Sequence, residues 1–159
     1  MQRSHIWAAF WFCVTISSAI VAFAAGQNAP KVEKGEQIMN EACMKCHDFR
    51  PIETQALDHE GWNKIVKTMI EKGATVSTED TPVLVEYLVK KHGPLPNGAG
   101  KKILLETCTL CHDLSRVREH SGTREEWEGL LVHMLGEGAP LADEDFEVLL
   151  NYLARNFRN

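Results

Sequence analysis

Cysteine is scarce and unevenly placed in this sequence of 159 residues. Of the five cysteines, Cys13 lies in an N-terminal apolar run, and the other four lie in two short motifs. No cysteine outside those motifs is left for a disulfide framework of the kind that staples small secreted proteins. The four motif cysteines therefore point to a bound group rather than to cross-links.

The sequence also lacks stretches in which apolar and polar residues alternate, the pattern of half-buried strands. We find no convincing strand and predict an all-α fold. Basic residues are outnumbered, with 17 Lys and Arg against 22 Asp and Glu, which gives a net charge of −5. An acidic surface argues against nucleic acid as a partner and favours cationic protein partners through steering, while a merely soluble surface is the alternative.

The N-terminus has the pattern of a secretory signal peptide. Arg3 supplies a positive charge, residues 6–25 form an apolar run, and residues 22–24 are an Ala-Phe-Ala cleavage pattern. We predict a signal peptide over residues 1–24 and therefore a periplasmic protein. Because the run is about 20 residues long, an uncleaved membrane anchor is the alternative. Cys13 has no lipobox-like sequence before it and is assigned no function.

Two Cys-x-x-Cys-His motifs dominate the remaining chain. Cys43, Cys46 and His47 form the first, and Cys108, Cys111 and His112 form the second. This motif attaches c-type haem, since each cysteine can form a thioether with a haem vinyl group and the histidine can bind iron. We predict two covalently attached c-type haems with His47 and His112 as proximal iron ligands. A zinc site built from the two cysteine pairs is the alternative, but it gives the histidines no role.

The chain repeats itself at an offset of 65 residues. Matched pairs include Gly35 with Gly100, Trp62 with Trp127, Met69 with Met134, and Tyr87 with Tyr152. Such a repeat should be settled before any other question of fold. We predict two tandem cytochrome c-like three-helix haem domains over residues 25–92 and 100–159. The Gly- and Pro-rich residues 93–99 are predicted to link them.

Three helices are predicted in each unit. The first covers residues 35–46 and 100–111, the second begins near Asp58 and Thr123, and the third begins near Thr78 and Asp143. Thr123 and Glu126 form a capping-box pattern. We expect C-caps at Gly73 and Gly138 and place Pro82 in the first turn of its helix.

One face of the second helix is predicted to be buried. Its residues follow i, i+3, i+4, i+7 spacing. They are Trp62, Ile65, Val66 and Met69, mirrored by Trp127, Leu130, Leu131 and Met134.

These features resemble the class I c-type cytochromes. The similar features are a glycine eight residues before the first motif cysteine, the motif itself, and a terminal helix carrying Tyr-Leu. The resemblance implies that the first and last helices of each unit cross at the glycine and at an aromatic residue. Met39 and Leu104 stand where the first helix usually has its aromatic residue, which alters that contact.

The chain departs from class I cytochromes between the second and third helices. That segment, residues 72–77 and 137–142, is short and contains no methionine. A second set of residues is closer to the dihaem domain of quinohaemoprotein amine dehydrogenases: Arg116, Arg118, Trp127, Met134, Gly138, Tyr152 and Leu153. That domain passes electrons from a quinone cofactor to an external acceptor. Because this chain has no quinone-bearing subunit, the resemblance implies electron carriage and not amine oxidation.

The sixth iron ligand decides what each haem can do. Met69 and Met134 are predicted as sixth ligands because they are repeat-paired and lie on the apolar face, with core filling as the alternative. His120 and His133 are the candidates if the second haem has two histidine ligands. Trp62 and Trp127 are predicted to pack against haem, with an indole N–H available to a propionate. The candidate partners for haem propionates are Arg50, Arg116 and Arg118.

We expect the protein to be an electron carrier rather than an enzyme. Its partners would be redox proteins, such as a dehydrogenase subunit or a respiratory complex. A small dihaem peroxidase is one alternative, although it needs acid–base groups over an open iron position, and no paired constellation of that kind is seen. A haem-based sensor module is the other alternative.

Overall fold

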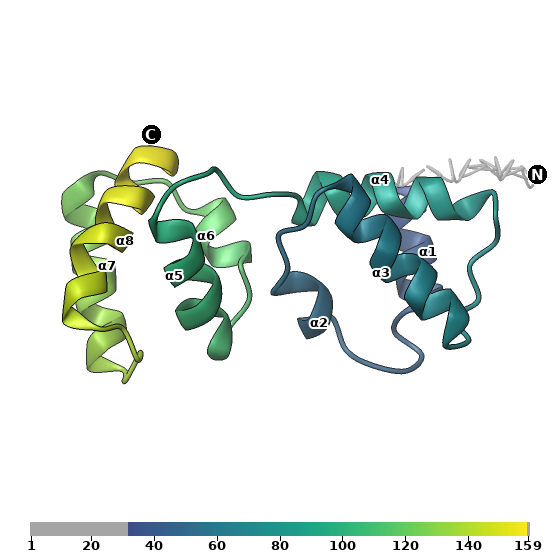
Figure 1. Ribbon diagram of the computed structural model, residues 1–159, viewed down its shortest axis with the longest axis horizontal. Coiled ribbons are helices and arrows are strands. Elements are labelled where there is room, and N and C mark those ends of the chain that lie inside the picture. Colours follow the sequence, from purple (N-terminus) through teal and green to yellow (C-terminus); the bar gives the residue numbers. More distant parts are fainter. Residues whose placement is uncertain (1–31, 159) are drawn as a thin grey trace, which may run out of the picture. The chain divides into compact units, whose positions relative to one another are not determined.

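The computed structural model describes residues 32–158, whose regular secondary structure is entirely helical, with eight α-helices, one 3-10 helix and no strand (Figure 1). In the first repeat α1 spans Lys34–Ala42, α2 Arg50–Glu53, α3 His59–Glu71 and α4 Asp80–His92. In the second repeat α5 spans Gly100–Thr107, η1 Cys108–Leu110, α6 Ser115–Glu119, α7 Arg124–Gly136 and α8 Asp143–Asn156. The predicted all-α class is confirmed. The predicted signal peptide and Cys13 lie outside the described residues.

The two repeats have separate hydrophobic cores. Trp62, Leu84 and Leu88 belong to the first core, and Trp127 and Leu149 belong to the second. In each repeat the last helix packs against both the first and the second long helix, so that α4 contacts α1 and α3, and α8 contacts α5 and α7 (Figure 1). The 65-residue sequence repeat is therefore also a repeat of packing.

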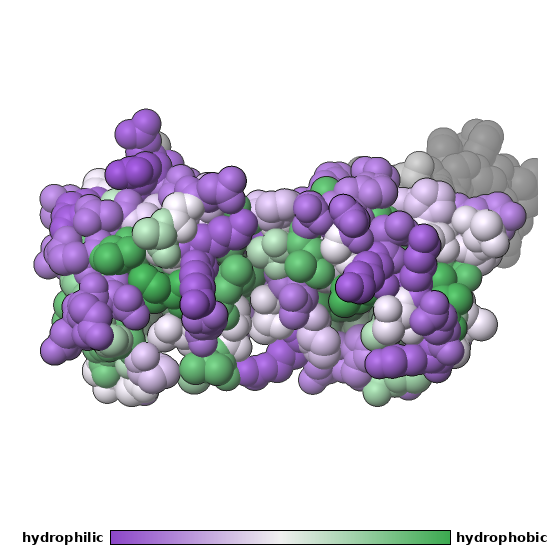
Figure 2. All heavy atoms as spheres, in the orientation of Figure 1, coloured by the Kyte–Doolittle hydropathy of each residue, from purple (hydrophilic) through white to green (hydrophobic). Residues whose placement is uncertain are grey.

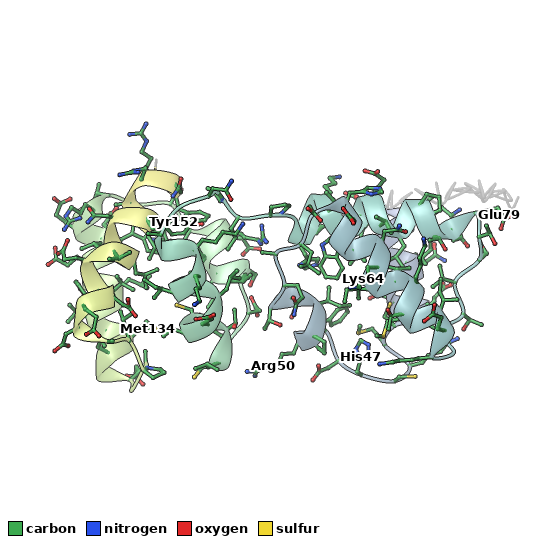
Figure 3. The ribbon with its side chains drawn as sticks, viewed as in Figure 1. His47, Arg50, Lys64, Glu79, Met134 and Tyr152 are labelled. Carbon is green, nitrogen blue, oxygen red and sulfur yellow. The ribbon has the colours of Figure 1, made fainter. Side chains whose placement is uncertain are left out.

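A glycine lies at the crossing of the first and last helices in both repeats. A Cβ atom added to Gly35 would lie 2.2 Å from Cβ of Tyr87, and one added to Gly100 would lie 2.4 Å from Cβ of Tyr152. Tyr152 projects from α8 at this crossing (Figure 3). Only glycine fits at these two positions, because real Cβ atoms do not approach other carbons so closely. In both repeats the first and last helices thus cross closely at this glycine, against a tyrosine of the last helix.

The helix boundaries with explicit capping signals are where the sequence predicts them. The Asp58 side chain accepts a hydrogen bond from the Gly61 amide at 2.8 Å and caps α3. Thr123 and Glu126 form both bonds of a capping box at the start of α7. Gly73 and Gly138 follow α3 and α7 with φ of 102° and 90°, the left-handed conformation typical of a helix end.

The first predicted helices of the two repeats extend too far. Instead of reaching Cys46 and Cys111, α1 ends at Ala42 and α5 ends at Thr107. The chain then tightens into turns, with a 3-10 helix over Cys108–Leu110. No glycine or proline marks this end, because the last turn can tighten into i to i+3 bonding without needing a special residue. The Cys-x-x-Cys segments therefore lie in turns after the helices.

Two further predictions about the helices need correction. The short helices α2 and α6 were not predicted, although Asp48 and Asp113 signal them: each carboxylate accepts a hydrogen bond from the amide two residues later. Ile65, placed on the buried face of α3, is 40% exposed. On α3 only Trp62 and Val66 are buried, so the buried face is narrower than predicted.

The predicted linker is held against the second repeat. Residues 93–99 are not helical, as predicted. Leu95 belongs to the second core, and the Tyr152 hydroxyl donates a hydrogen bond to the Pro96 carbonyl at 2.7 Å. Among residues 32–158, no helix is long and apolar enough to cross a membrane.

Candidate haem-binding sites

The two cysteine motifs have the same arrangement around their own cores. Cys43 packs at the edge of the first core and Cys108 at the edge of the second, and burial raises the pKa of both thiols. Cys46 and Cys111 are exposed. Each pair therefore presents one sulfur beside the core and one toward solvent.

The two motif histidines are held in the same tautomer. Nδ1 of His47 lies 2.8 Å from the Asp48 carbonyl oxygen, and Nδ1 of His112 lies 3.0 Å from the Asp113 carbonyl oxygen. A carbonyl oxygen can only accept a hydrogen bond, so Nδ1 carries the proton and Nε2 keeps its lone pair. This is how a metal-binding histidine is usually oriented, with the other ring nitrogen bonded to a carbonyl.

The aspartate after each histidine fixes the next stretch of chain. Asp48 accepts a hydrogen bond from the Arg50 amide at 3.1 Å, and Asp113 accepts one from the Ser115 amide at 2.7 Å. The Ser115 hydroxyl also bonds to Asp113, and these bonds lower the pKa of its carboxyl group. Histidine, aspartate and the following short helix thus form one rigid unit in both repeats.

A cavity of about 610 Å³ brings the predicted residues of the second site together. It is lined by both motif cysteines, His112, Met134 and Trp127. Its volume lies in the range of sites that bury a cofactor-sized ligand. The α7 helix carries Trp127 and Met134 on the face that borders this cavity, seven residues apart and so two turns along the helix. Met134 is labelled in Figure 3.

The lining of this cavity suits haem. Most of it is aliphatic, with Leu104, Leu131 and Leu149 from three different helices. Arg116, His120, Glu119 and Glu137 add polar groups to the wall. An apolar wall with a few polar side chains matches a flat apolar macrocycle that carries carboxylates at one edge. The residues present therefore fit a covalently held haem.

His120 is placed differently from His133. The Nε2 atom of His120 is buried and has no hydrogen-bond partner among the described residues. Its ring meets Trp127 edge-on, with 4.5 Å between centroids and an angle of 90° between planes. His133 is exposed and does not line the cavity. Of the two alternative histidine ligands, only His120 borders the second site.

The indole N–H groups are already used by the protein. Trp62 donates to the His92 carbonyl at 3.1 Å, and Trp127 donates to the Phe157 carbonyl at 2.9 Å. Both bonds fasten the middle helix to the end of the last helix. These N–H groups are therefore not available to a haem propionate as predicted. Only the tryptophan rings could pack against a haem. Among the candidate arginines, Arg116 lines the cavity, whereas Arg118 donates to the Gly93 carbonyl at 2.6 Å.

The first repeat gathers its predicted residues less closely. Trp62 is 1% exposed within the first core, while His47 and Met69 are half-buried. Neither of the two main cavities among residues 32–158 contains His47 or Met69. The second main cavity, of about 670 Å³, lies at the junction of the repeats and is lined by Tyr87, Pro96 and Arg118 among others.

In the part of the chain that the structure describes, no group of three or more His, Cys, Asp or Glu side chains is placed to hold a metal ion. Comparison with known proteins found no matching family profile, no matching curated protein and no matching solved structure.

Proposed function

We propose that this protein is a periplasmic dihaem c-type cytochrome that carries single electrons between redox proteins. It would consist of two tandem cytochrome c-like three-helix haem domains. The observation that carries the proposal is the duplicated motif in which the His47 and His112 rings are both held by the next carbonyl, leaving Nε2 free. The resemblance to class I and quinohaemoprotein dihaem cytochromes supports it.

The proposal gives a role to several residues that line the cavity of about 610 Å³ in the second repeat. A bound haem would supply one-electron chemistry at its iron. Cys108 and Cys111 would tether the group, and His112 Nε2 and Met134 would bind its iron. The aliphatic wall would exclude water, and Arg116 would pair with a propionate. Cys43, Cys46, His47, Met69 and Trp62 would have the matching roles in the first repeat.

The surface around the second motif supports exchange with a protein partner. Leu110 is 57% exposed and stands next to Cys111, which is also exposed. Exposed apolar residues lie among polar ones on the face of the molecule drawn in Figure 2. The predicted net charge of the chain is negative, so the proposed partner presents a cationic docking surface.

The test is expression in a bacterial host that attaches c-type haem in the periplasm. We expect the purified protein to hold two covalent haems, measured by intact mass and by the pyridine haemochromogen spectrum. Cys43→Ala with Cys46→Ala should remove one haem, and Cys108→Ala with Cys111→Ala should remove the other. A protein that contains zinc and no haem would overturn the proposal in favour of the zinc alternative.

A further inference from the structure

Arg50 extends from the first repeat to the second attachment motif. It begins α2, and its Nη2 donates to the Leu110 carbonyl at 2.5 Å and to the Thr109 carbonyl at 3.4 Å. Thr109 and Leu110 are the two residues between Cys108 and Cys111. In Figure 3 the Arg50 side chain lies beyond α2, on the side away from His47. A first-repeat cation therefore contacts the backbone of the second Cys-x-x-Cys turn.

A second bond between the repeats holds this contact in place. The Leu114 amide donates to the Glu53 carbonyl at 3.1 Å, which joins the end of α2 to the start of α6. Both ends of α2 therefore bond to the second repeat. Arg50, at the start of α2, bonds to Leu110, and Glu53, at its end, bonds to Leu114. The Arg50 side chain is therefore held against the second motif by hydrogen bonds.

The charge of Arg50 is not cancelled by a contact ion pair. Among residues 32–158, no salt bridge involves Arg50. Asp48 is its nearest carboxylate in sequence, but that side chain bonds to the Arg50 backbone amide. The guanidinium group points its donors at the backbone of the second motif.

Arg50 also breaks the symmetry between the repeats. Each motif histidine is followed by an aspartate, so Asp48 and Asp113 affect their own sites alike. The residue that matches Arg50 in the second repeat is the neutral Ser115. The second motif, which has Leu110 where the first has Lys45, thus receives its cation from the other repeat.

We propose that Arg50 is a positioning residue for the second haem, and that its charge makes this haem easier to reduce than the first. The inference rests on the proposed function. A nearby cation disfavours the ferric state, which carries one more positive charge than the ferrous state, and so raises the reduction potential. Electrons entering at the first haem would then collect at the second.

Equilibrium redox titration of the two-haem protein, followed by absorbance, tests this inference. We expect two waves in the wild-type titration. Arg50→Gln should move one wave to lower potential by about a tenfold change in equilibrium constant, or 59 mV for one electron. Arg50→Lys keeps the charge and should restore most of the shift.

Two control variants identify the wave that moves. Arg116→Gln removes an arginine that lines the same cavity as His112, so the wave that it shifts is assigned to the second haem. Arg50→Gln should lower that same wave. Lys45→Gln removes a cation from the first motif and leaves the Arg50–Leu110 bond intact, so it should not reproduce the effect.

Each outcome decides between the alternatives. Equal movement of both waves, no movement, or the same shift in Lys45→Gln would overturn the inference while leaving two haems and the proposed function in place. Loss of the second haem alone in Arg50→Gln, restored in Arg50→Lys, would support the positioning role. Absence of haem from the wild-type protein would instead overturn the proposed function.

Discussion

At the scale of single residues, the identity of the sixth ligand can be tested directly. Met134 lines the cavity that contains His112, so Met134→Ala should remove the second haem's share of the weak red charge-transfer band of ferric haem with a methionine ligand and leave the first haem's share in place. Loss of the thioether should also lower the potential of that haem. Leu130→Ala, from the same cavity wall, is the matched control and should keep the band. If the second haem contributes no such band and Met134→Ala leaves the spectrum unchanged, Met134 is not the ligand and His120, which also lines the cavity, becomes the candidate.

The helix-crossing glycines give a second prediction at this scale. Gly35→Ala and Gly100→Ala should each lower the free energy of unfolding by about 1–3 kcal/mol, because the new methyl group would overlap a tyrosine Cβ. Gly129→Ala is the control: nothing lies within 4 Å of a Cβ there, so alanine should stabilise α7 by about 0.5–1 kcal/mol. Urea unfolding measures both. Similar effects at the three positions would show that the crossings tolerate a side chain.

The sequence identified some residues of the candidate site but not the contacts that others make. Repeat matching paired Met134 with Met69, and the structure places Met134 beside His112. It could not show that the Trp127 N–H is taken by the Phe157 carbonyl, because a backbone acceptor 30 residues away leaves no trace in composition or periodicity. The burial of His120 against Trp127 was also missed, since its repeat partner is a glutamine.

At the scale of elements, the capping box of α7 offers a sharp test. Thr123→Ala removes the acceptor of the Glu126 amide, while the reciprocal bond from the backbone amide of residue 123 to the Glu126 side chain can remain. The expected loss in the free energy of unfolding is about 1 kcal/mol. Ser121→Ala, two residues earlier at an exposed position, should change it little. Equal losses in the two variants would indicate that the cap contributes nothing measurable.

Helix boundaries that carry a local capping residue were easier to predict than those that do not. Asp58, Thr123, Gly73 and Gly138 are local signals whose physical effect is complete within one turn, so sequence alone placed them correctly. The ends of α1 and α5 depend on how the motif turn packs against its core, which no single residue encodes. The four- and five-residue helices α2 and α6 are too short for periodicity to reveal.

At the scale of the whole molecule, the junction between repeats was the least predictable part. Its Gly and Pro content predicted a break in helix but not that Leu95 would enter the second core or that Arg118 would bond to Gly93. Such contacts join residues far apart in sequence. Repeat matching can therefore find what the two halves share, but not what lies between them.

His92, the last residue of α4, makes this junction sensitive to pH. Burial lowers the pKa of its half-buried ring, with Arg118 and Lys91 adding to the effect and Asp113 opposing it. The unfolded chain, with a histidine pKa of about 6.5, therefore binds more protons than the folded chain below that pH. The stability that neutral His92 contributes is present above pH ~6.5 and is lost as the pH falls through the lower folded pKa.

We accordingly expect the free energy of unfolding to fall between pH 7 and pH 5, and His92→Gln to make that fall shallower. His133→Gln removes an exposed histidine and should leave the slope unchanged. Urea titrations at three pH values, followed by circular dichroism, give the slopes, and the motif histidines contribute equally to all three proteins. Parallel slopes for wild type and His92→Gln would place the pH sensitivity elsewhere. A shallower slope for His92→Gln alone would show that the joint between the two repeats, and not only the haem sites, responds to protons.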